Sequence, residues 1–286
     1  MRNFAGIEDK YSNFETVSTL LQSIPYDGTS TWGKGADKAF SAFLDAAENM
    51  ELYDIETDSE VYKSGIHILP EIIEKSSPEA MVTAVYHTTK KILNTKKFPT
   101  FFGGEHSVSI GIIRAFQEQY PNLTVLQLDA HADLRPEYGS TPYNHACALH
   151  EASKTTNLIQ VGIRSMDTCE LPYLNRKQCF FAEQIHNQTA WMAQSIALMT
   201  DPVYITIDLD VFDPSIMPST GTPEPGGLDW YTVTRYLRQV FNQQQVVGFD
   251  ITELAPRPEL RAPDFLTAKL YYKLLSYQFE SNNNEV

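Results

Sequence analysis

The sequence lacks any segment that approaches the roughly 20 consecutive apolar residues needed for a helix to cross a bilayer. Residues 1–10 also lack the apolar core of a signal peptide. Hydrophobic residues make up 42% of the chain, which is ordinary for a globular protein. We therefore expect a globular protein with no partner in a membrane.

Cysteine is scarce, with three residues in the whole chain, at positions 147, 169 and 179. The number is odd and no two of them form a C-x-x-C pair, which excludes a disulfide framework or a thioredoxin-like redox motif. This usage favours a reducing compartment, so we expect a cytoplasmic protein.

Basic residues are outnumbered, with 22 Lys and Arg against 36 Asp and Glu, giving a formal net charge of −14. No run of basic residues occurs anywhere in the chain, which argues against nucleic acid or an anionic membrane as a partner. Acidity of this kind also confers solubility on its own. A small cationic ligand is the partner class that the charge favours.

Linkers and repeats are missing as well. No Ser/Gly-rich or Pro-rich stretch divides the 286 residues, a length near the upper limit of a single hydrophobic core. We predict one domain over residues 1–286, with the polar end, 279–286, as a flexible tail.

Apolar strand-like runs alternate with amphipathic stretches along the chain, a rhythm typical of α/β proteins. The predicted strands are 16–24, 52–55, 98–102, 123–128, 158–163, 179–182, 203–209 and 246–251. The predicted helices lie near 36–48, 78–95, 107–120, 144–153, 188–199, 229–242 and 265–278. The fold class expected is a three-layer α/β/α sandwich with a mostly parallel sheet of about eight strands.

Two carboxylate clusters follow two of these strands directly. Residues 129–133 read Asp-Ala-His-Ala-Asp, and residues 208–213 read Asp-Leu-Asp-Val-Phe-Asp. Because side chains alternate along an extended chain, 129, 131 and 133 would share one face, as would 208 and 210. The pattern predicts several metal ligands aimed at one place.

Two further strand ends carry polar residues, namely 103–106 (Gly-Gly-Glu-His) and 250–253 (Asp-Ile-Thr-Glu). One aspartate at a strand end often caps the next helix, but capping does not explain four such ends. In open α/β sheets ligands bind outside the carboxyl ends of the strands. The sequence therefore places a site at this edge of the sheet.

The donor types indicate the metal. The candidate ligands are two histidines and four aspartates: His106, Asp129, His131, Asp133, Asp208 and Asp210. This oxygen-rich set without thiolate suits Mn²⁺ or a similar hard divalent ion better than structural zinc. Two such ions roughly 3.5–4 Å apart can activate a shared water, so the chemistry expected is hydrolysis.

These motifs resemble those of the ureohydrolases, the family of arginases, agmatinases and formimidoylglutamases. Residues 103–107, 129–133 and 207–214 are similar, in that order, to the family's three metal motifs. Residues 24–28 (Ile-Pro-Tyr-Asp-Gly) resemble a segment near the family's amino end, although the Gly-Pro and Ile-Arg signals that follow there are replaced by residues 35–39.

The resemblance implies an arginase-like fold and a mechanism. Asp129 and Asp208 would bridge two Mn²⁺ ions, with the remaining ligands completing the two shells, and metal-bound hydroxide would attack the guanidinium carbon to release urea and an amine. His145, in residues 143–147, matches the family's proton shuttle, and Glu253 matches the glutamate that pairs with the guanidinium.

Two segments and one arginine bear on the choice of substrate. Residues 224–225 and 143–146 look more like agmatinases than arginases, so agmatine, cleaved to urea and putrescine in polyamine metabolism, is the first choice. Arg135 would suit a carboxylated substrate such as guanidinobutyrate or formimidoylglutamate, or it pairs with Glu137 or a neighbouring subunit. Arginase, guanidinobutyrase and formimidoylglutamase stay open as alternatives.

Two other classes compete with this interpretation. A non-catalytic polyamine- or amino-acid-binding protein on the same fold would usually lack ligands or the shuttle, and none is missing here. A deacetylase-like amide hydrolase would use a single zinc ion. The resemblance also implies a homo-oligomer, a trimer or a hexamer.

Overall fold

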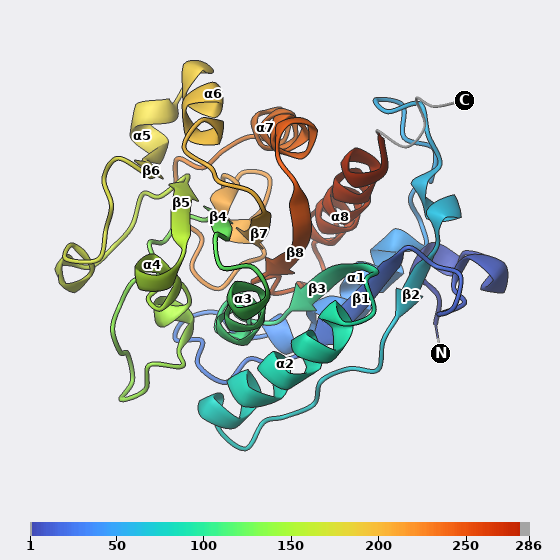
Figure 1. Ribbon diagram of the computed structural model, residues 1–286, viewed down its shortest axis with the longest axis horizontal. Helices are drawn as coiled ribbons and strands as arrows, with labels where there is room; N and C mark the ends of the chain where they lie inside the picture. Colours follow the sequence, from blue (N-terminus) through green and yellow to red (C-terminus); the bar gives the residue numbers. More distant parts are fainter. Residues whose placement is uncertain (1, 281–286) are drawn as a thin grey trace.

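One eight-stranded sheet runs through the computed structural model, which describes residues 2–280 (Figure 1). Its strand order is β2-β1-β3-β8-β7-β4-β5-β6, and every adjacent pair is parallel. The strands are β1 Thr19–Ile24, β2 Ile66–Ile68, β3 Phe98–Gly103, β4 Thr124–Leu128, β5 Asn157–Val161, β6 Cys179–Phe180, β7 Val203–Asp208 and β8 Val246–Thr252.

Helices cover both faces of this sheet, which confirms the three-layer α/β/α arrangement. They are α1 Ala39–Ala47, α2 Pro78–Leu93, α3 Val108–Gln119, α4 Ala152–Thr155, α5 Ala182–Ile185, α6 Ala190–Ile196, α7 Trp230–Gln243 and α8 Ala262–Glu280. Helices α1, α6, α7 and α8 pack on one face, and α2, α3 and α4 pack on the other.

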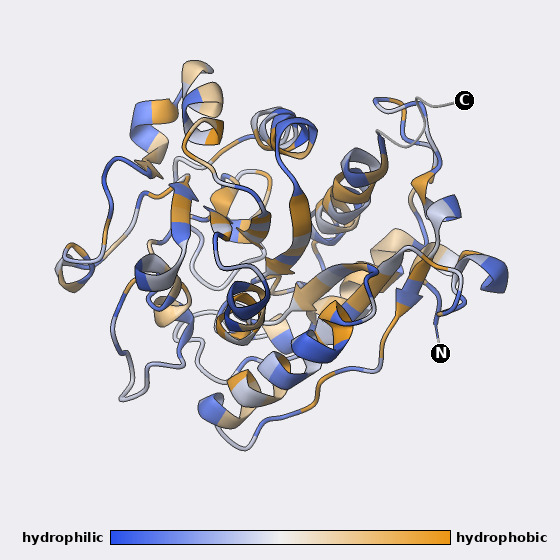
Figure 2. Cartoon of the chain, viewed as in Figure 1, coloured by the Kyte–Doolittle hydropathy of each residue, from blue (hydrophilic) through white to orange (hydrophobic). Residues whose placement is uncertain are grey.

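Alternation along the strands explains why both faces are covered. Leu21 and Ile205 belong to the core under α1, α7 and α8, while their neighbours Leu20 and Tyr204 belong to the core under α2 and α3. Because each strand is buried on both sides, the strands are apolar runs, as parallel sheets require. In Figure 2 helix α2 carries hydrophobic and hydrophilic residues side by side, as expected for a helix with one buried face.

The strand expected at 52–55 is wrong. Its chain forms only an isolated antiparallel bridge between Asp54 and Ser59, and the edge strand beside β1 is Ile66–Ile68 instead. The physical reason is the buried carboxylate of Asp54, which pairs with Lys273 of α8 at 2.9 Å and so holds this segment against that helix rather than at the sheet edge.

The helix expected over 144–153 is also wrong in extent. The chain forms a short 3₁₀ helix, His145–Cys147, and then α4. The N–H group of Leu149 donates to the carbonyl of Asp133 instead of to residue 145, which interrupts the helical ladder.

The prediction of a tail over 279–286 is wrong for its first two residues. Phe279 and Glu280 complete α8, where Glu280 pairs with Arg238, and residues 281–286 lie outside the described residues.

The four strands that carry the candidate site are neighbours in the sheet, in the order β3, β8, β7 and β4. Strands β3 and β4 follow one another in the chain but are separated in space by β8 and β7, which creates the kind of switch point at which α/β proteins bind ligands. Among the described residues, no helix combines the length and apolarity that crossing a membrane demands.

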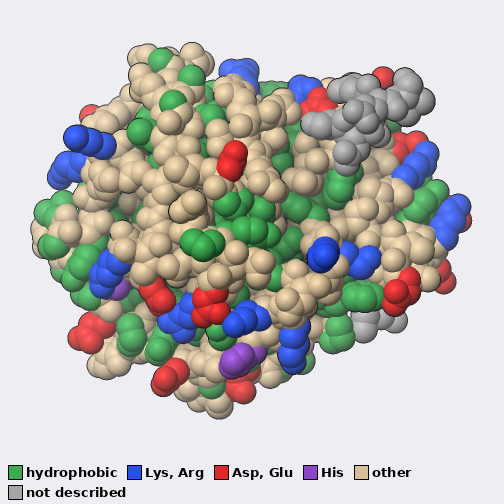
Figure 3. Space-filling view, in the orientation of Figure 1, with side chains coloured by type: hydrophobic (Ala, Val, Ile, Leu, Met, Phe, Trp, Pro, Cys, Tyr) green, Lys and Arg blue, Asp and Glu red, His purple; other side chains and the backbone are tan. Residues whose placement is uncertain are grey.

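Charged side chains are mixed on the surface. On the face shown in Figure 3, Lys and Arg side chains are interspersed with Asp and Glu, and no broad basic patch gathers among the described residues drawn there.

Candidate metal centre and active site

The imidazole of His106 lies among three carboxylates. Its Nδ1 atom is 3.0 Å from Asp133 Oδ2, 3.2 Å from Asp129 Oδ2 and 3.4 Å from Asp208 Oδ2. Donor atoms about 3 Å apart can be bound by one ion that lies about 2.0–2.2 Å from each. All four side chains are buried, so the protein would exclude water from the part of an ion's surface that these residues contact.

A second group forms around His131. Its Nδ1 atom lies 2.8 Å from Asp210 Oδ2 and 3.7 Å from Asp129 Oδ1. Asp129 therefore belongs to both groups, with Oδ2 toward His106 and Oδ1 toward His131. A carboxylate placed between two sets of donors is the arrangement that a bridging ligand needs.

The expected extended geometry is wrong at Asp133 and Asp210, which the backbone reaches by local turns, whereas His131 forms a parallel bridge with Ser165. Asp133 has a φ of 53°, in the left-handed region that non-glycine residues seldom adopt. Asp208 ends β7 and caps the 3₁₀ helix Leu209–Val211, because its Oδ1 accepts the N–H of Asp210 at 2.9 Å. Asp210 is thus brought back by a helical turn rather than by strand alternation.

The electrostatics of the carboxylates fit divalent cations. Burial raises the pKa values of Asp129, Asp133 and Asp208, and neighbouring carboxylates raise them further, to about 7 for Asp133. Burial opposes protonation of His131, yet Asp210 raises the pKa of that imidazole to about 10. So much buried negative charge calls for a compensating cation, and four carboxylates with two imidazoles form a donor set for hard ions such as Mn²⁺.

A layer of hydrogen bonds orients the candidate ligands. Thr206 Oγ1 lies 2.9 Å from His106 Nε2 and donates to Asp250 Oδ1 at 2.7 Å. Gln127 Nε2 donates to Asp129 Oδ2 at 2.7 Å. Neither Thr206 nor Gln127 was predicted from the sequence, although each is a polar residue two positions before a candidate ligand on an apolar strand, which is a visible signal.

Arg164, which was not predicted from the sequence either, links the backbone after β7 to the loop that contains Glu224. Its guanidinium donates to the main-chain carbonyls of Asp210 and, at 2.9 Å, Glu224. Asp213 accepts the N–H groups of Ser215 and Gly227 at 3.0 and 3.1 Å.

Glu253 follows β8 at the same edge and also has an unusual backbone, with a φ of 69°. Its Oε1 atom accepts the N–H of His106 at 2.8 Å, and burial, with the charge of Glu105 adding to it, raises its pKa well above the usual range. Left-handed conformations at non-glycine residues cluster at functional sites, and both Asp133 and Glu253 have them.

His145 begins the short 3₁₀ helix after the second motif and lines the same cavity. Its Nδ1 atom lies 3.1 Å from Thr29 Oγ1. Burial, together with the charges of His131 and His106, lowers the pKa of His145 to about 4. The ring is therefore neutral near pH 7.

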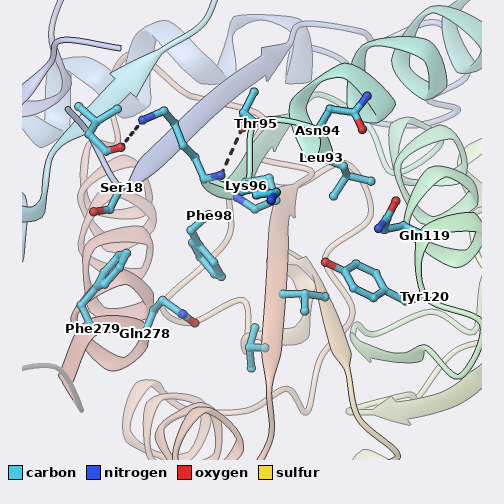
Figure 4. Close-up of a pocket in the computed structure, with 15 residues that line it drawn as sticks. Ser18, Leu93, Asn94, Thr95, Lys96, Phe98, Gln119, Tyr120, Gln278 and Phe279 are labelled. Atoms are coloured by element: carbon cyan, nitrogen blue, oxygen red, sulfur yellow. Dashed lines mark hydrogen bonds between the residues drawn. The ribbon is translucent and has the colours of Figure 1, made fainter. Parts of the chain in front are cut away.

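The cavity over the centre has a volume of about 240 Å³ and is lined by candidate ligands, His145 and Glu253. A larger cavity, of about 800 Å³, lies near the start of β3 and β8, at the opposite edge of the sheet (Figure 4). Phe98, Tyr120 and Phe279 line it, and none of the six candidate ligands does. The candidate metal ligands, His145 and Glu253 are therefore associated with the smaller cavity.

Arg135 lies at the smaller cavity with its charge already paired. Its guanidinium is 3.4 Å from Asp167 Oδ2 and stacks on the ring of Tyr138, 4.6 Å from the centroid. The partner expected for it was Glu137 or another subunit, and the partner observed within the chain is Asp167. A guanidinium held in this way is less available to bind a substrate carboxylate.

The sequence of this chain matches the Arginase family over residues 18–276. The chain belongs to the arginase family. It is 33% identical to the N(1)-aminopropylagmatine ureohydrolase of Synechocystis sp., over 96% of this chain and 94% of that protein, and 27% identical to the agmatinase of Pyrococcus horikoshii, over 90% of each. These relatives confirm the resemblance that the three motifs indicated, and with it a metal-dependent hydrolase of linear amidines.

Solved structures of the family agree with the fold. The agmatine ureohydrolase of Thermoplasma volcanium superposes with a TM-score of 0.88 at 25% identity, covering 100% of this chain and 97% of that one. The arginase of Bacillus cereus superposes with a TM-score of 0.75 at 22% identity, covering 91% and 98%. The arginase-like architecture expected from the sequence is confirmed.

Proposed function

We propose that this protein hydrolyses the guanidinium group of agmatine to urea and putrescine with two Mn²⁺ ions. The observation that carries the proposal is the position of Asp129, whose two oxygens face two separate groups of donors, each with its own histidine. When bound, a pair of divalent ions supplies the positive charge that makes a water nucleophilic near neutral pH. The other ligands would be His106, His131, Asp133, Asp208 and Asp210.

Residues of the chain would orient the substrate and transfer the proton. Glu253 faces the cavity and would orient the planar guanidinium through its N–H groups, as a carboxylate can accept two of them in parallel. His145, neutral in this structure, would take up a proton released during the attack and deliver it to the leaving amine. Because the candidate carboxylate ligands are buried, substrate could reach them only through the cavity.

The charge at the cavity supports a dicationic substrate. Apart from the candidate ligands, the cavity is lined by three acidic residues, Glu253, Glu170 and Asp167, and by one cation that pairs with Asp167, Arg135. A dication such as agmatine suits surroundings in which acidic groups outnumber basic ones. Arginine, guanidinobutyrate and formimidoylglutamate add a carboxylate to the same surroundings, so we rank them below agmatine.

A second candidate substrate is N(1)-aminopropylagmatine, the compound named in the Synechocystis relative. Its extra aminopropyl group adds a further cation that would extend past the mouth of the cavity. Two partly exposed carboxylates lie beside the cavity: Asp167 lines it, and Glu224 Oε1 lies 3.8 Å from Nε2 of the lining residue His131. They are suitably charged to receive such an extension.

Urea release by the Mn²⁺-loaded protein tests the proposal. Agmatine, N(1)-aminopropylagmatine, arginine and guanidinobutyrate are compared at equal concentration, and formamide release is followed with formimidoylglutamate. A higher kcat/KM for either cationic substrate supports the proposal. Preference for a carboxylated substrate overturns the substrate assignment and places Arg135 in the binding site. A protein that binds these compounds without turnover would be the non-catalytic alternative.

We further propose a cytoplasmic homo-oligomer, a trimer or a hexamer. The three cysteines are free in the structure, as a reducing compartment requires. Light scattering coupled to size-exclusion chromatography measures the number of subunits.

A further inference from the structure

Thr29 joins two elements of the site that are distant in sequence. Its hydroxyl donates to Glu105 Oε1 at 2.9 Å, next to the candidate ligand His106. The same oxygen atom lies 3.0 Å from the backbone nitrogen and 3.1 Å from Nδ1 of His145. A single side chain thus connects the β3–α3 turn to the segment that carries the proposed proton shuttle.

The direction of these hydrogen bonds follows from the donors available. Glu105 is fully buried, and its Oε1 also accepts the hydroxyl of Ser107 at 2.8 Å, so this oxygen is an acceptor. Thr29 has one hydroxyl proton, which it gives to Glu105. The lone pairs of Thr29 Oγ1 are then left to accept from His145, whose Nδ1 must carry a hydrogen to complete the pair.

We propose that Thr29, held by Glu105, is a positioning residue that fixes His145 as the Nδ1–H tautomer. The basic lone pair then lies on Nε2, the ring nitrogen that is not used by Thr29. Such an imidazole is ready to accept a proton at Nε2 and to release it from the same atom. This inference rests on the proposed function, because it assigns to His145 the proton transfer of that reaction.

Substitutions at residue 29 can separate its hydrogen bonds from its packing in the loop. In the same loop Thr31 lines the cavity, and the N–H of Gly33 donates to the carbonyl of Gly221 at 3.2 Å. Valine has nearly the shape of threonine but neither donates nor accepts, whereas serine does both. Thr29→Val and Thr29→Ser therefore separate the hydrogen bonds from the packing.

The kinetic test measures kcat and KM for agmatine with the Mn²⁺-loaded variants, after metal analysis has shown equal Mn²⁺ content. Thr29→Val is expected to lower kcat by 10-fold or more, within the roughly 10²–10⁴-fold that a general acid–base group provides, with KM little changed. Thr29→Ser is expected to keep most of kcat. Thr155→Val, an exposed threonine at the end of α4, serves as the matched control.

A double-mutant comparison excludes a merely structural role. In the His145→Ala background, Thr29→Val should cause no further loss of kcat, because its effect acts through the missing ring. Equal fold losses in both backgrounds would overturn the proposal, as would a Thr29→Val variant with wild-type kcat.

An activity-independent measurement keeps this inference separate from the proposed function. Nitrogen-15 NMR of the imidazoles, on protein exchanged into diamagnetic Mg²⁺, should show His145 as the Nδ1–H tautomer in the wild type and a changed tautomer distribution in Thr29→Val. An Nε2–H tautomer in the wild type overturns the inference even if urea is released. The predicted tautomer in a protein that releases no urea would instead place the failure in the proposed function.

Discussion

Thr206 Oγ1 lies 2.9 Å from Nε2 of His106, on the side of the imidazole away from the aspartates. Because the same hydroxyl donates to Asp250, it accepts from His106 and thereby fixes which ring nitrogen faces the metal centre. Thr206→Val should weaken Mn²⁺ binding by about 10- to 100-fold, the usual cost of losing such a partner, and Thr206→Ser should restore it. Isothermal titration of the metal-free variants measures this, and equal affinities would show that Thr206 only fills space.

Substitutions at Asp129 and His145 are predicted to have different effects on metal binding and turnover. Asp129→Ala removes the carboxylate common to both groups of donors, so metal and activity should both be lost. His145→Ala leaves all six proposed ligands in place, so it should retain both ions while turnover falls by roughly 10²–10⁴-fold. Metal analysis of the two purified variants separates these cases. Equal metal retention in both would contradict the ligand assignment.

Asp167 is predicted to tune the affinity for the charged end of the substrate. Asp167→Asn should raise KM for agmatine a few-fold and leave kcat nearly unchanged, because exposed charges interact weakly across water. Asparagine keeps the hydrogen bond with which this residue caps its 3₁₀ helix. Butylguanidine, which lacks the second ammonium group, is the control substrate, and a KM that rose equally for both compounds would show that the substitution disturbs the cavity itself.

The buried pair of Lys273 and Asp54 is predicted to make stability depend on acid pH. Burial by itself would raise the pKa values of Asp54 and Glu56, but Lys273 lowers both below their usual values. Carboxyls with lowered folded pKa values stabilise the fold fully above their unfolded values, near 4, and lose that effect as the pH falls through the folded values. Lys273→Met should therefore cost about 3–5 kcal/mol at pH 7 and progressively less below pH 4.

Chemical denaturation of wild type and Lys273→Met at several pH values checks this difference. The same substitution at the exposed Lys63, which pairs with Glu60 at 2.6 Å, should change stability little at any pH. A Lys273→Met penalty that stayed constant from pH 7 to pH 3 would show that the charge pair does not contribute.

The sequence was informative where the structure depends on local patterns. Seven of the eight predicted strands form, since buried parallel strands are apolar runs that can be recognised one at a time. The edge strand β2 has only three residues, Ile66–Ile68, and depends on pairing with β1, which no local pattern reveals. The segment 144–153 looked helical because of its composition, but long-range bonds such as that between Leu149 and Asp133 redirect its backbone.

In the candidate site, too, local features could be predicted from the sequence and features that depend on long-range packing could not. His106, Asp129 and Asp208 stand out because polar residues at the ends of apolar strands are conspicuous. Nothing local could show that Asp133 and Glu253 adopt positive φ angles, or that Thr29 lies within 3.1 Å of His145, because these features arise from the packing of loops against the finished sheet.

The dependence of urea release on the number of bound Mn²⁺ ions shows whether the centre is binuclear. Metal-free protein is titrated with Mn²⁺ in the presence of agmatine, and the rate is compared with the number of ions bound per chain. We predict no urea without metal, full activity only when both sites are filled, and no recovery in Asp129→Asn. Full activity with no metal, or with a single ion bound per chain, would contradict a binuclear centre that shares Asp129.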